Sequence, residues 1–188
     1  MRQRLGIGQD TPYVMFLGRL HPIKRLDLLG RAFALVAAQH PDVRLVIAGD
    51  GDPRVRADAE AALGSASART LWLGEVSGHE RDALLAEAAT LVLCSDSENF
   101  GMSVAEALSC GLAPVVTQTC PWQILEHERA GYWVPQTPDA IAGAIGQVLA
   151  SPGASREMGL RGQRLVAERF SPAAIGARWI DAYERLAR

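Results

Sequence analysis

The chain alternates between short apolar runs and longer segments with apolar residues at helical spacing, from one end of its 188 residues to the other. The apolar runs are continuous and rich in β-branched residues, which is typical of strands buried on both faces. Such strands, each followed by a helix, form a parallel sheet covered by helices on both sides. The alternation therefore predicts an α/β fold, a Rossmann-like doubly wound parallel sheet of six strands.

The boundaries follow from turn residues, glycines and prolines between the periodic segments. No repeat or internal linker interrupts the pattern, and 48% hydrophobic residues over this length suit one domain, residues 1–188, with a sizeable core. The predicted strands are residues 13–17, 43–48, 70–73, 90–94, 114–117 and 132–134. The predicted helices are residues 26–38, 54–63, 80–88, 102–109, 123–127, 138–150, 154–169 and 172–187.

Composition excludes several classes of protein. The formal net charge of -2 gives no sign of a nucleic-acid partner. No apolar run is long enough to span a membrane, and the first residues lack the apolar core of a signal peptide. The three cysteines lack CxxC spacing and the four histidines are scattered, so we expect reduced thiols, a cytoplasmic protein and no metal site.

Charged residues follow the first and the fourth predicted strands. Arg19 and Lys24 come just after the first strand and Gly18, and Glu98 comes just after the fourth. In a doubly wound sheet of order 3-2-1-4-5-6, ligands bind where strand order reverses, between strands one and four. We therefore expect these two loops to meet across one crevice, although they are far apart in the sequence.

Two glutamates, Glu98 and Glu106, have seven residues between them, and a helix is predicted to begin between them. The N-terminus of a helix offers free N–H groups and positive dipole character, so it attracts phosphate. Glu106 could accept hydrogen bonds from both hydroxyls of a ribose. Glu98 could orient a sugar hydroxyl and favour an oxocarbenium-like state.

The remaining candidate residues suit a phosphate between these carboxylates. Gly18 allows close approach of the backbone, Arg19 can donate two parallel hydrogen bonds, and Lys24 adds a compact charge. Backbone N–H groups can come from the start of the predicted helix, at Gly101, Met102 and Ser103.

Each of these residues has a simpler interpretation when taken alone. A single Arg or Lys after a strand is usually a solvated charge, a lone helical Glu usually faces water, and Gly101 could serve only a turn. Their convergence at one switch point favours a binding site. His21 could also line the crevice, although a surface or capping role is favoured. Ser103 lacks the flanking glycines of a hydrolase nucleophile, and no dinucleotide or Walker fingerprint is present.

Three segments resemble a known family: residues 16–24, 45–51 and 97–111 are similar to the donor-binding domain of retaining GT-B glycosyltransferases, family-4 type (glycosyl transferases group 1). The resemblance covers nearly the whole chain. Its most specific elements are the spacing from Glu98 to Glu106 and the pair Arg19 and Lys24. The sequence departs from the commoner pattern at Arg25 and Asn99, where the family often has Gly.

The resemblance implies a nucleoside diphosphate sugar as the substrate and no metal or other cofactor. It implies that Glu98, Arg19 and Lys24 are catalytic, with Glu98 at the sugar and the two cations on the diphosphate. It also implies a base that contacts the backbone near Val76 and a ribose held by Glu106. The residues expected to bind the nucleotide are Gly18, Val76, Gly101, Met102, Ser103 and Glu106.

The resemblance also implies a larger enzyme with a second, N-terminal domain that mostly binds the acceptor, which we expect to be absent from this chain. The acceptor would be a sugar, a lipid-linked sugar or a small molecule, and peripheral association of the full enzyme with the inner face of a membrane stays open. The last helix is similar to one that crosses back toward that domain, so Trp179 and Ile180 could be exposed, or the helix could simply dock on the core. The alternative function is a nucleotide-binding module without catalysis, and the isolated fragment is expected to be inactive.

Overall fold

Six parallel strands form one sheet, in the order β3-β2-β1-β4-β5-β6. We describe residues 2–187 from a computed structural model. The strands are β1 Tyr13–Leu17, β2 Arg44–Ala48, β3 Thr70–Gly74, β4 Thr90–Leu93, β5 Val115–Thr117 and β6 Tyr132–Val134. The predicted fold class, strand order and six strands are therefore confirmed, with boundaries that differ by one residue at most.

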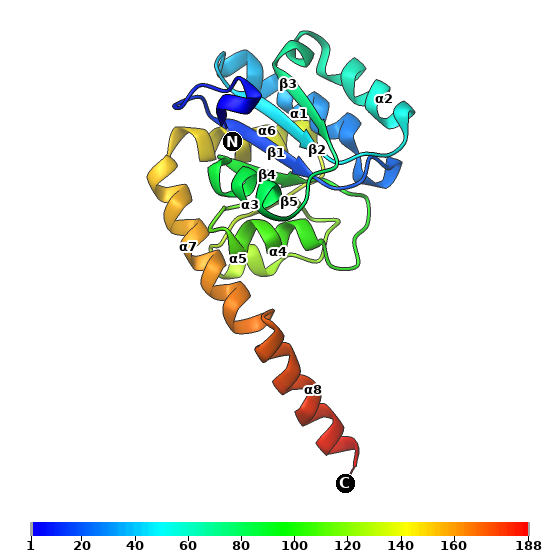
Figure 1. Ribbon diagram of the computed structural model, residues 1–188, viewed down its shortest axis with the longest axis vertical. Coiled ribbons are helices and arrows are strands. Elements are labelled where there is room, and N and C mark those ends of the chain that lie inside the picture. The colour runs from blue at the N-terminus through cyan, green and yellow to red at the C-terminus, as the bar shows by residue number, and fades with distance from the viewer. Residues whose placement is uncertain (1, 188) are drawn as a thin grey trace.

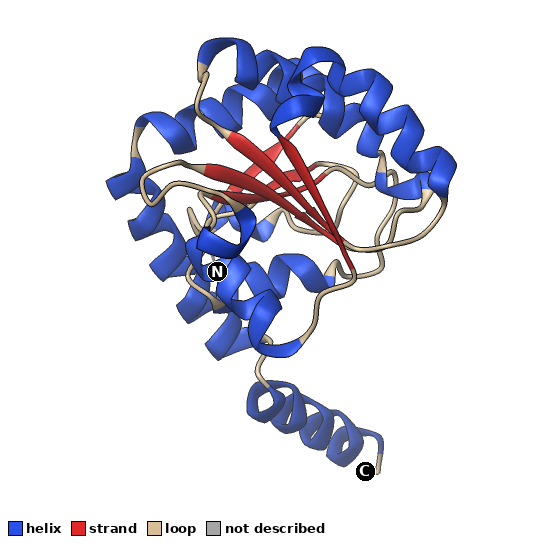
Figure 2. Ribbon diagram, turned by 45° about the horizontal axis from the view of Figure 1, so that its top comes forward, coloured by secondary structure: helices blue, strands red, loops and turns tan. Residues whose placement is uncertain are grey.

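Helices cover both faces of this sheet (Figure 1, Figure 2). The helices are α1 Leu26–Gln39, α2 Pro53–Leu63, α3 Gly78–Glu87, α4 Met102–Ser109, α5 Ile124–His127, α6 Pro138–Ala150, α7 Pro152–Arg169 and α8 Pro172–Leu186. Three short 3-10 helices were not predicted: η1 Arg2–Leu5, η2 Pro22–Lys24 and η3 Gly64–Arg69.

The sheet separates two hydrophobic cores. In β1, Val14 and Phe16 face the core formed with α1, α2 and α6. Tyr13 and Met15 face the other core, formed with α3, α4, α5 and α7. All four side chains are completely buried. Burial on both faces explains why the strand is a continuous apolar run and does not alternate with polar residues.

Several helices begin where the sequence supplies a capping side chain followed by proline. Asp52 accepts a hydrogen bond from the backbone N–H of Arg54 at 2.9 Å, at the start of α2. Ser171 accepts one from the backbone N–H of Ala174 at 3.2 Å, at the start of α8. Such caps satisfy N–H groups that have no partner within the helix, and proline suits the first helical position.

Helix α7 packs closely against the end of α4 because it has glycine at the contact. A Cβ atom at Gly159 would lie 1.8 Å from the carbonyl oxygen of Gly111, and one at Gly162 would lie 2.3 Å from Leu108 Cδ2. No side chain fits at Gly159 without moving one of the two backbones. The glycines therefore set the distance between α7 and the body of the domain.

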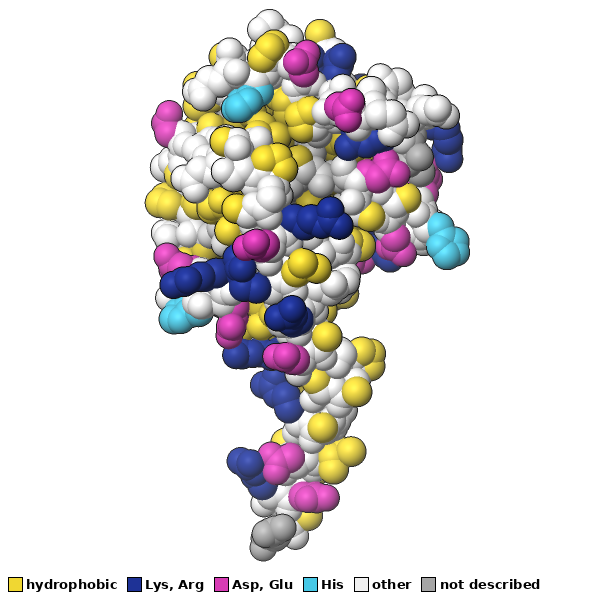
Figure 3. Space-filling view, turned by 90° about the vertical axis from the view of Figure 1, so that its left-hand side faces the viewer, with side chains coloured by type: hydrophobic (Ala, Val, Ile, Leu, Met, Phe, Trp, Pro, Cys, Tyr) yellow, Lys and Arg dark blue, Asp and Glu magenta, His cyan; other side chains and the backbone are white. Residues whose placement is uncertain are grey.

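Helix α8 leaves the body of the domain and protrudes (Figure 1). None of its residues is buried, and the side chains of Trp179, Ile180 and Tyr183 are 59%, 62% and 65% exposed. The rings of Trp179 and Tyr183 stack with centroids 5.9 Å apart. Hydrophobic side chains line the protruding helix in the space-filling view (Figure 3). The expected exposed apolar face is confirmed, and the docked alternative is wrong for this chain.

Within the described part of the chain, no helix combines the length and the apolar character that crossing a membrane requires.

Candidate functional site

The carboxyl ends of β1 and β4 lie side by side, because these two strands pair in parallel at the centre of the sheet. The β1–α1 loop (residues 18–25) and the β4–α4 loop (residues 94–101) leave from these ends. The backbone N–H of Asp96 donates to the carbonyl oxygen of Ile23 at 2.8 Å. The prediction that the two loops meet at the switch point is confirmed.

Lys24 and Glu98 contact each other directly across these loops. The Lys24 ammonium meets Glu98 Oε1, and the hydroxyl of Ser95 donates to the same oxygen at 2.7 Å. The two charged side chains are only 20% and 11% exposed. No residue of the described chain donates to Glu98 Oε2, so one carboxylate oxygen is left for a ligand.

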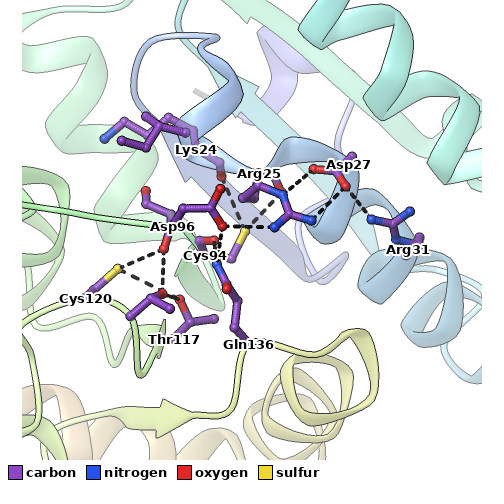
Figure 4. Close-up of polar contacts among 12 residues, drawn as sticks. Lys24, Arg25, Asp27, Arg31, Cys94, Asp96, Thr117, Cys120 and Gln136 are labelled. Atoms are coloured by element: carbon purple, nitrogen blue, oxygen red, sulfur yellow. Dashed lines mark hydrogen bonds and ion pairs between the residues drawn. The ribbon is translucent and has the colours of Figure 1, made fainter.

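A network of polar contacts lies behind this pair (Figure 4). Asp96 Oδ1 accepts from Arg25 Nη1 at 2.9 Å and from Gln136 Nε2 at 3.0 Å. Gln136 also donates to the carbonyl oxygen of Cys94 at 3.0 Å, and Arg25 Nε donates to Asp27 at 3.0 Å. A third loop, which follows β6, is thus tied to the two that carry Lys24 and Glu98.

Arg25 stands where the family often has glycine, and its contacts explain how the chain tolerates a larger residue there. Its φ of 51° lies in the left-handed region, where glycine is favoured. Its two ion pairs, with Asp27 and Asp96, hold the residue there despite that cost. Burial alone would raise the pKa of Asp27, but the hydrogen bond and charge of Arg25, with help from Arg31, hold it below the ordinary value of 3.8.

The N-terminus of α4 presents free backbone N–H groups. Gly101 precedes the helix with φ 83° and ψ 67°, and no side chain caps it. In the part of the chain that the structure describes, the N–H groups of Gly101, Met102 and Ser103 donate to no residue. Unpaired N–H groups and the positive end of the helix dipole together favour an anion.

Gly18 and Arg19 lie on the same loop as Lys24 but make fewer contacts. The backbone N–H of Gly18 donates to the carbonyl oxygen of Ala48 at 3.0 Å. The Arg19 side chain is exposed, and none of residues 2–187 pairs with its guanidinium. The structure therefore brings together Lys24 and Glu98, while Arg19 is joined to them only through the backbone.

Glu106 lies on the far side of the anion site and has a partner that sequence reasoning missed. Arg81 of α3 places Nη1 2.9 Å from Glu106 Oε1. Its Nε and Nη2 donate to Asp82 Oδ1 at 3.0 and 2.9 Å. The Glu106 side chain is 26% exposed and lines a cavity of about 790 Å³. One signal could have found Arg81: it lies in the first turn of the helix that follows the segment assigned to the base.

Val76 lies in the loop between β3 and α3, just before that helix. It is half-buried and packs on the core that α3 and α4 share. The preceding Gly74 accepts a hydrogen bond from the backbone N–H of Gly49 at 2.7 Å, which holds the loop at the carboxyl end of the sheet. The expected base segment thus leads directly to the helix that bears Arg81.

His21 and the three cysteines lie in surroundings typical of residues with a structural role. His21 accepts from the backbone N–H of Ile23 at 3.3 Å, which is the capping role favoured from the sequence. The three cysteines are free, and burial raises the pKa of Cys94 to about 12. Burial also raises the pKa values of Cys110 and Cys120 above the usual range. Among the described residues, no group of three or more His, Cys, Asp or Glu side chains could hold a metal ion.

Known proteins are similar to this chain in sequence and in fold. The family described as glycosyl transferases group 1 matches residues 1–165. An uncharacterised glycosyltransferase of Methanocaldococcus jannaschii is 30% identical over 97% of this chain and 47% of its own length. A GDP-mannose-dependent alpha-(1-6)-phosphatidylinositol monomannoside mannosyltransferase of Mycolicibacterium smegmatis is 29% identical over 95% of this chain and 49% of its own length.

A solved structure shows the same fold. Anabaena HepE, crystallised in complex with UDP-glucose, superposes with a TM-score of 0.85 at 22% identity, over 98% of this chain and 51% of HepE. The chain thus spans about half the length of the relatives it matches. The match over residues 1–165 and the GT-B fold of its neighbours lead to one conclusion: the chain belongs to the glycosyl transferases group 1.

Proposed function

We propose that this chain binds a nucleoside diphosphate sugar and forms the sugar-donor half of a retaining glycosyltransferase. One observation carries the proposal: the contact between Lys24 and Glu98 lies beside the uncapped N-terminus of α4. A cation and free N–H groups for a diphosphate thus stand next to a carboxylate for a sugar. HepE, which has the same fold, was crystallised with UDP-glucose, and this supports a nucleotide-sugar ligand.

The diphosphate end of the site stabilises the leaving group. Lys24 and Arg19 supply positive charge, and the N–H groups of Gly101, Met102 and Ser103 supply hydrogen bonds. Gly18 lets the backbone approach the phosphate. Negative charge grows on the diphosphate as the sugar departs, and one preorganised hydrogen-bond donor at such a charge contributes about 3 kcal/mol. These groups take the place that a metal ion has in other transferases, so the proposed reaction uses no metal.

The nucleoside end of the site has one carboxylate and a segment of backbone. Glu106 accepts from the ribose hydroxyls, and Arg81 orients the Glu106 carboxylate. The base contacts the backbone at Val76. Relatives use different nucleotides, since one is named for GDP-mannose and HepE was crystallised with UDP-glucose, and we therefore leave the base open.

Glu98 acts at the sugar. Positive charge develops at the anomeric carbon as the bond to the diphosphate breaks, and a carboxylate on the loop favours that charge. Glu98 Oε2 is the oxygen available for a sugar hydroxyl, because Lys24 and Ser95 both contact Oε1.

The acceptor belongs to a region beyond this chain, as the half-length match to relatives suggests. We propose that an N-terminal acceptor domain of a longer cytoplasmic enzyme covers the exposed face of α8. Its acceptor is a sugar, a lipid-linked sugar or a small molecule. The alternative is that this chain by itself only binds the nucleotide sugar, and the α8 face favours that behaviour for the isolated chain, because the apolar side chains of Trp179, Ile180 and Tyr183 are exposed there.

Calorimetry with UDP, GDP and ADP, compared with uridine, guanosine and adenosine, tests the proposal on this chain. We expect one diphosphate to bind at least about tenfold more tightly than its nucleoside, since charged hydrogen bonds contribute ~1.5–3 kcal/mol each. Equal affinity for nucleoside and diphosphate in all three pairs would contradict a diphosphate site.

Product formation separates the transferase from the binding module. A longer protein that contains this chain, incubated with the diphosphate sugar that binds best and a panel of acceptors, should release the diphosphate. NMR of the product should show the anomeric configuration of the sugar donor. Inversion would remove the retaining assignment, and binding without any turnover would favour the module.

A further inference from the structure

Trp122 lies directly behind the β4–α4 loop. It follows β5, only 1% of its side chain is exposed, and its indole N–H donates to the carbonyl oxygen of Phe100. We propose that Trp122 is a positioning residue: it sets the orientation of the Phe100–Gly101 peptide and thereby aims the N–H of Gly101 at the ligand. The inference rests on the proposed diphosphate site and adds a residue that contacts no ligand itself.

The argument begins with the geometry of a trans peptide. Its C=O and N–H groups lie in one plane and point in opposite directions. No cis peptide bond occurs among the residues that the structure describes. When the indole binds the Phe100 carbonyl, the N–H of Gly101 must point away from the packed indole.

Gly101 is also confined by the same side chain. A Cβ atom at Gly101 would lie 3.1 Å from Trp122 Nε1 and 3.1 Å from Leu93 Cδ2. Its φ of 83° is one that residues with a side chain rarely adopt. Trp122 therefore donates to the carbonyl oxygen of the Phe100–Gly101 peptide and also packs closely against Gly101.

Trp122 is itself held in place by other aromatic rings. Its ring centroid lies 5.2 Å from that of Phe100 and 5.6 Å from that of Phe170, and the latter two are 5.4 Å apart. Tilted and edge-on rings at these separations attract one another. The backbone N–H of Trp122 donates to the carbonyl oxygen of Cys120 at 2.8 Å, which fixes the residue from the other side.

The segment that carries Trp122 also holds the other end of the β4–α4 loop. Thr119 Oγ1 donates to the carbonyl oxygen of Ser95 at 2.6 Å, and the Ser95 hydroxyl in turn contacts Glu98. The loop is thus bound at a backbone carbonyl near each of its ends. Thr119 supports the glutamate, and Trp122 supports the amide that precedes α4.

The test compares two tryptophans that make the same kind of hydrogen bond. Trp122→Phe keeps an aromatic ring and removes the N–H that holds Phe100. Trp133→Phe is the control, because Trp133 donates at 3.1 Å to the carbonyl oxygen of Cys120, which is outside the β4–α4 loop and keeps its second donor, the backbone N–H of Trp122, when that indole is gone. Calorimetry of each variant with UDP and uridine, and with GDP and guanosine, gives the preference for the diphosphate.

We expect Trp122→Phe to lower the affinity for the diphosphate about tenfold while nucleoside affinity stays the same, the loss of one well-aligned bond to a charged group. Trp133→Phe should keep the wild-type preference. Phe170→Leu, which loosens the aromatic packing but keeps the indole N–H, should also keep most of it. An unchanged preference in Trp122→Phe, or equal losses for nucleoside and diphosphate, would overturn the inference.

A second measurement needs no ligand. In ¹H–¹⁵N spectra of the unliganded chain, Trp122→Phe should shift the amide resonance of Gly101 more than that of Ser103, because the Phe100–Gly101 peptide loses its hydrogen bond to the indole. Trp133→Phe should leave Gly101 unchanged. If the wild type binds no diphosphate, the proposed function fails while this measurement still decides whether Trp122 orients the peptide. A Gly101 amide unaffected by Trp122→Phe would refute the inference on its own.

Discussion

The two glutamates of the site are each held by one cationic side chain, but in different surroundings. Glu98 is 11% exposed and contacts both Lys24 and Ser95, with the Arg25–Asp96–Gln136 network behind. Glu106 is 26% exposed, and Arg81 is the one cation paired with it in the described chain. Glu98 is thus held by contacts on several sides, whereas Glu106 is held by one residue.

This difference suggests a division of roles. Lys24 is the last residue of a short 3-10 helix, and Arg25 of the network follows it directly. The position of Lys24 therefore depends on the neighbouring loops. Arg81 has a second partner in Asp82 and can release Glu106 without losing every charged contact. Preorganised groups favour catalysis because they need no rearrangement during the reaction, whereas a movable pair can adapt to different ligands.

The largest effect is expected where positive charge is removed. Arg19→Ala combined with Lys24→Ala should abolish the preference for a nucleoside diphosphate over its nucleoside, a loss of about 100-fold or more if two charged hydrogen bonds disappear. Each affinity can be measured by calorimetry. Arg164→Ala combined with Arg178→Ala removes the same number of positive charges from exposed positions on α7 and α8, and this control should keep the preference. If the double variant keeps it too, the phosphate site lies elsewhere.

Glu106→Ala should weaken binding of nucleosides and diphosphates alike. The expected loss is ~1–3 kcal/mol, or about 5–150-fold, because charged hydrogen bonds to the ribose disappear. A double-mutant cycle with Arg81→Leu measures how strongly the two residues are coupled. An unchanged affinity in Glu106→Ala would remove this residue from the site, and zero coupling would mean that the pair forms no functional unit.

Substitution of Glu98 is expected to change the affinity for the plain diphosphate less, and to raise it. Glu98→Gln should bind UDP or GDP about threefold more tightly, because one negative charge near the phosphates is gone and Lys24 is released. The variant should lose the additional affinity that the sugar provides in UDP-glucose or GDP-mannose. Titrations of both ligand types on wild type and variant give the two effects. Weaker binding of the plain diphosphate would contradict the Lys24–Glu98 competition on which this prediction rests.

The smallest effect is the pH dependence of the stability that Asp27 contributes through its ion pair with Arg25. The pKa of Asp27 is lowered in the folded protein, so its contribution to stability is present above the unfolded pKa near 4 and is lost as pH falls through the lower folded value. In urea unfolding, Asp27→Asn should be less stable than wild type at pH 7, and the gap should close below about pH 4. A gap that stays constant down to pH 2 would exclude this titration.

The spacing of apolar residues, together with the glycines and prolines between segments, predicted the helices and strands of this fold well. Helix α4 has the predicted bounds, Met102–Ser109, since an apolar helical pattern lies between two glycines. The meeting of the two loops that carry Lys24 and Glu98 followed from strand order, because parallel strands place the loops that follow them at one edge; the direct contact between the two side chains was not predicted. The 3-10 helix at Pro22–Lys24 was missed because a three-residue turn has no periodicity to read.

Contacts between side chains of separate elements were beyond the sequence. Arg81 reaches Glu106 because α3 packs beside α4, and the two residues are too far apart in the sequence for a local pattern to indicate the contact. Trp122 reaches Phe100 across a loop, and no local pattern encodes that approach. Such contacts depend on how whole helices and loops pack, which follows from the complete core.

The glycine contact of α7 has a mechanical consequence for α8. Gly159 rests against the carbonyl oxygen of Gly111, and from there the chain continues through two helices to Leu186. At 1.5 Å per residue these 27 residues (186 − 159) form an arm of about 40 Å at most. A tilt of about 5° at the glycine would move the far end of such an arm by roughly 3 Å. A methyl group at Gly159 would thus be felt at the far end of α8 only after the contacts of Leu165 and Phe170 with the core had given way.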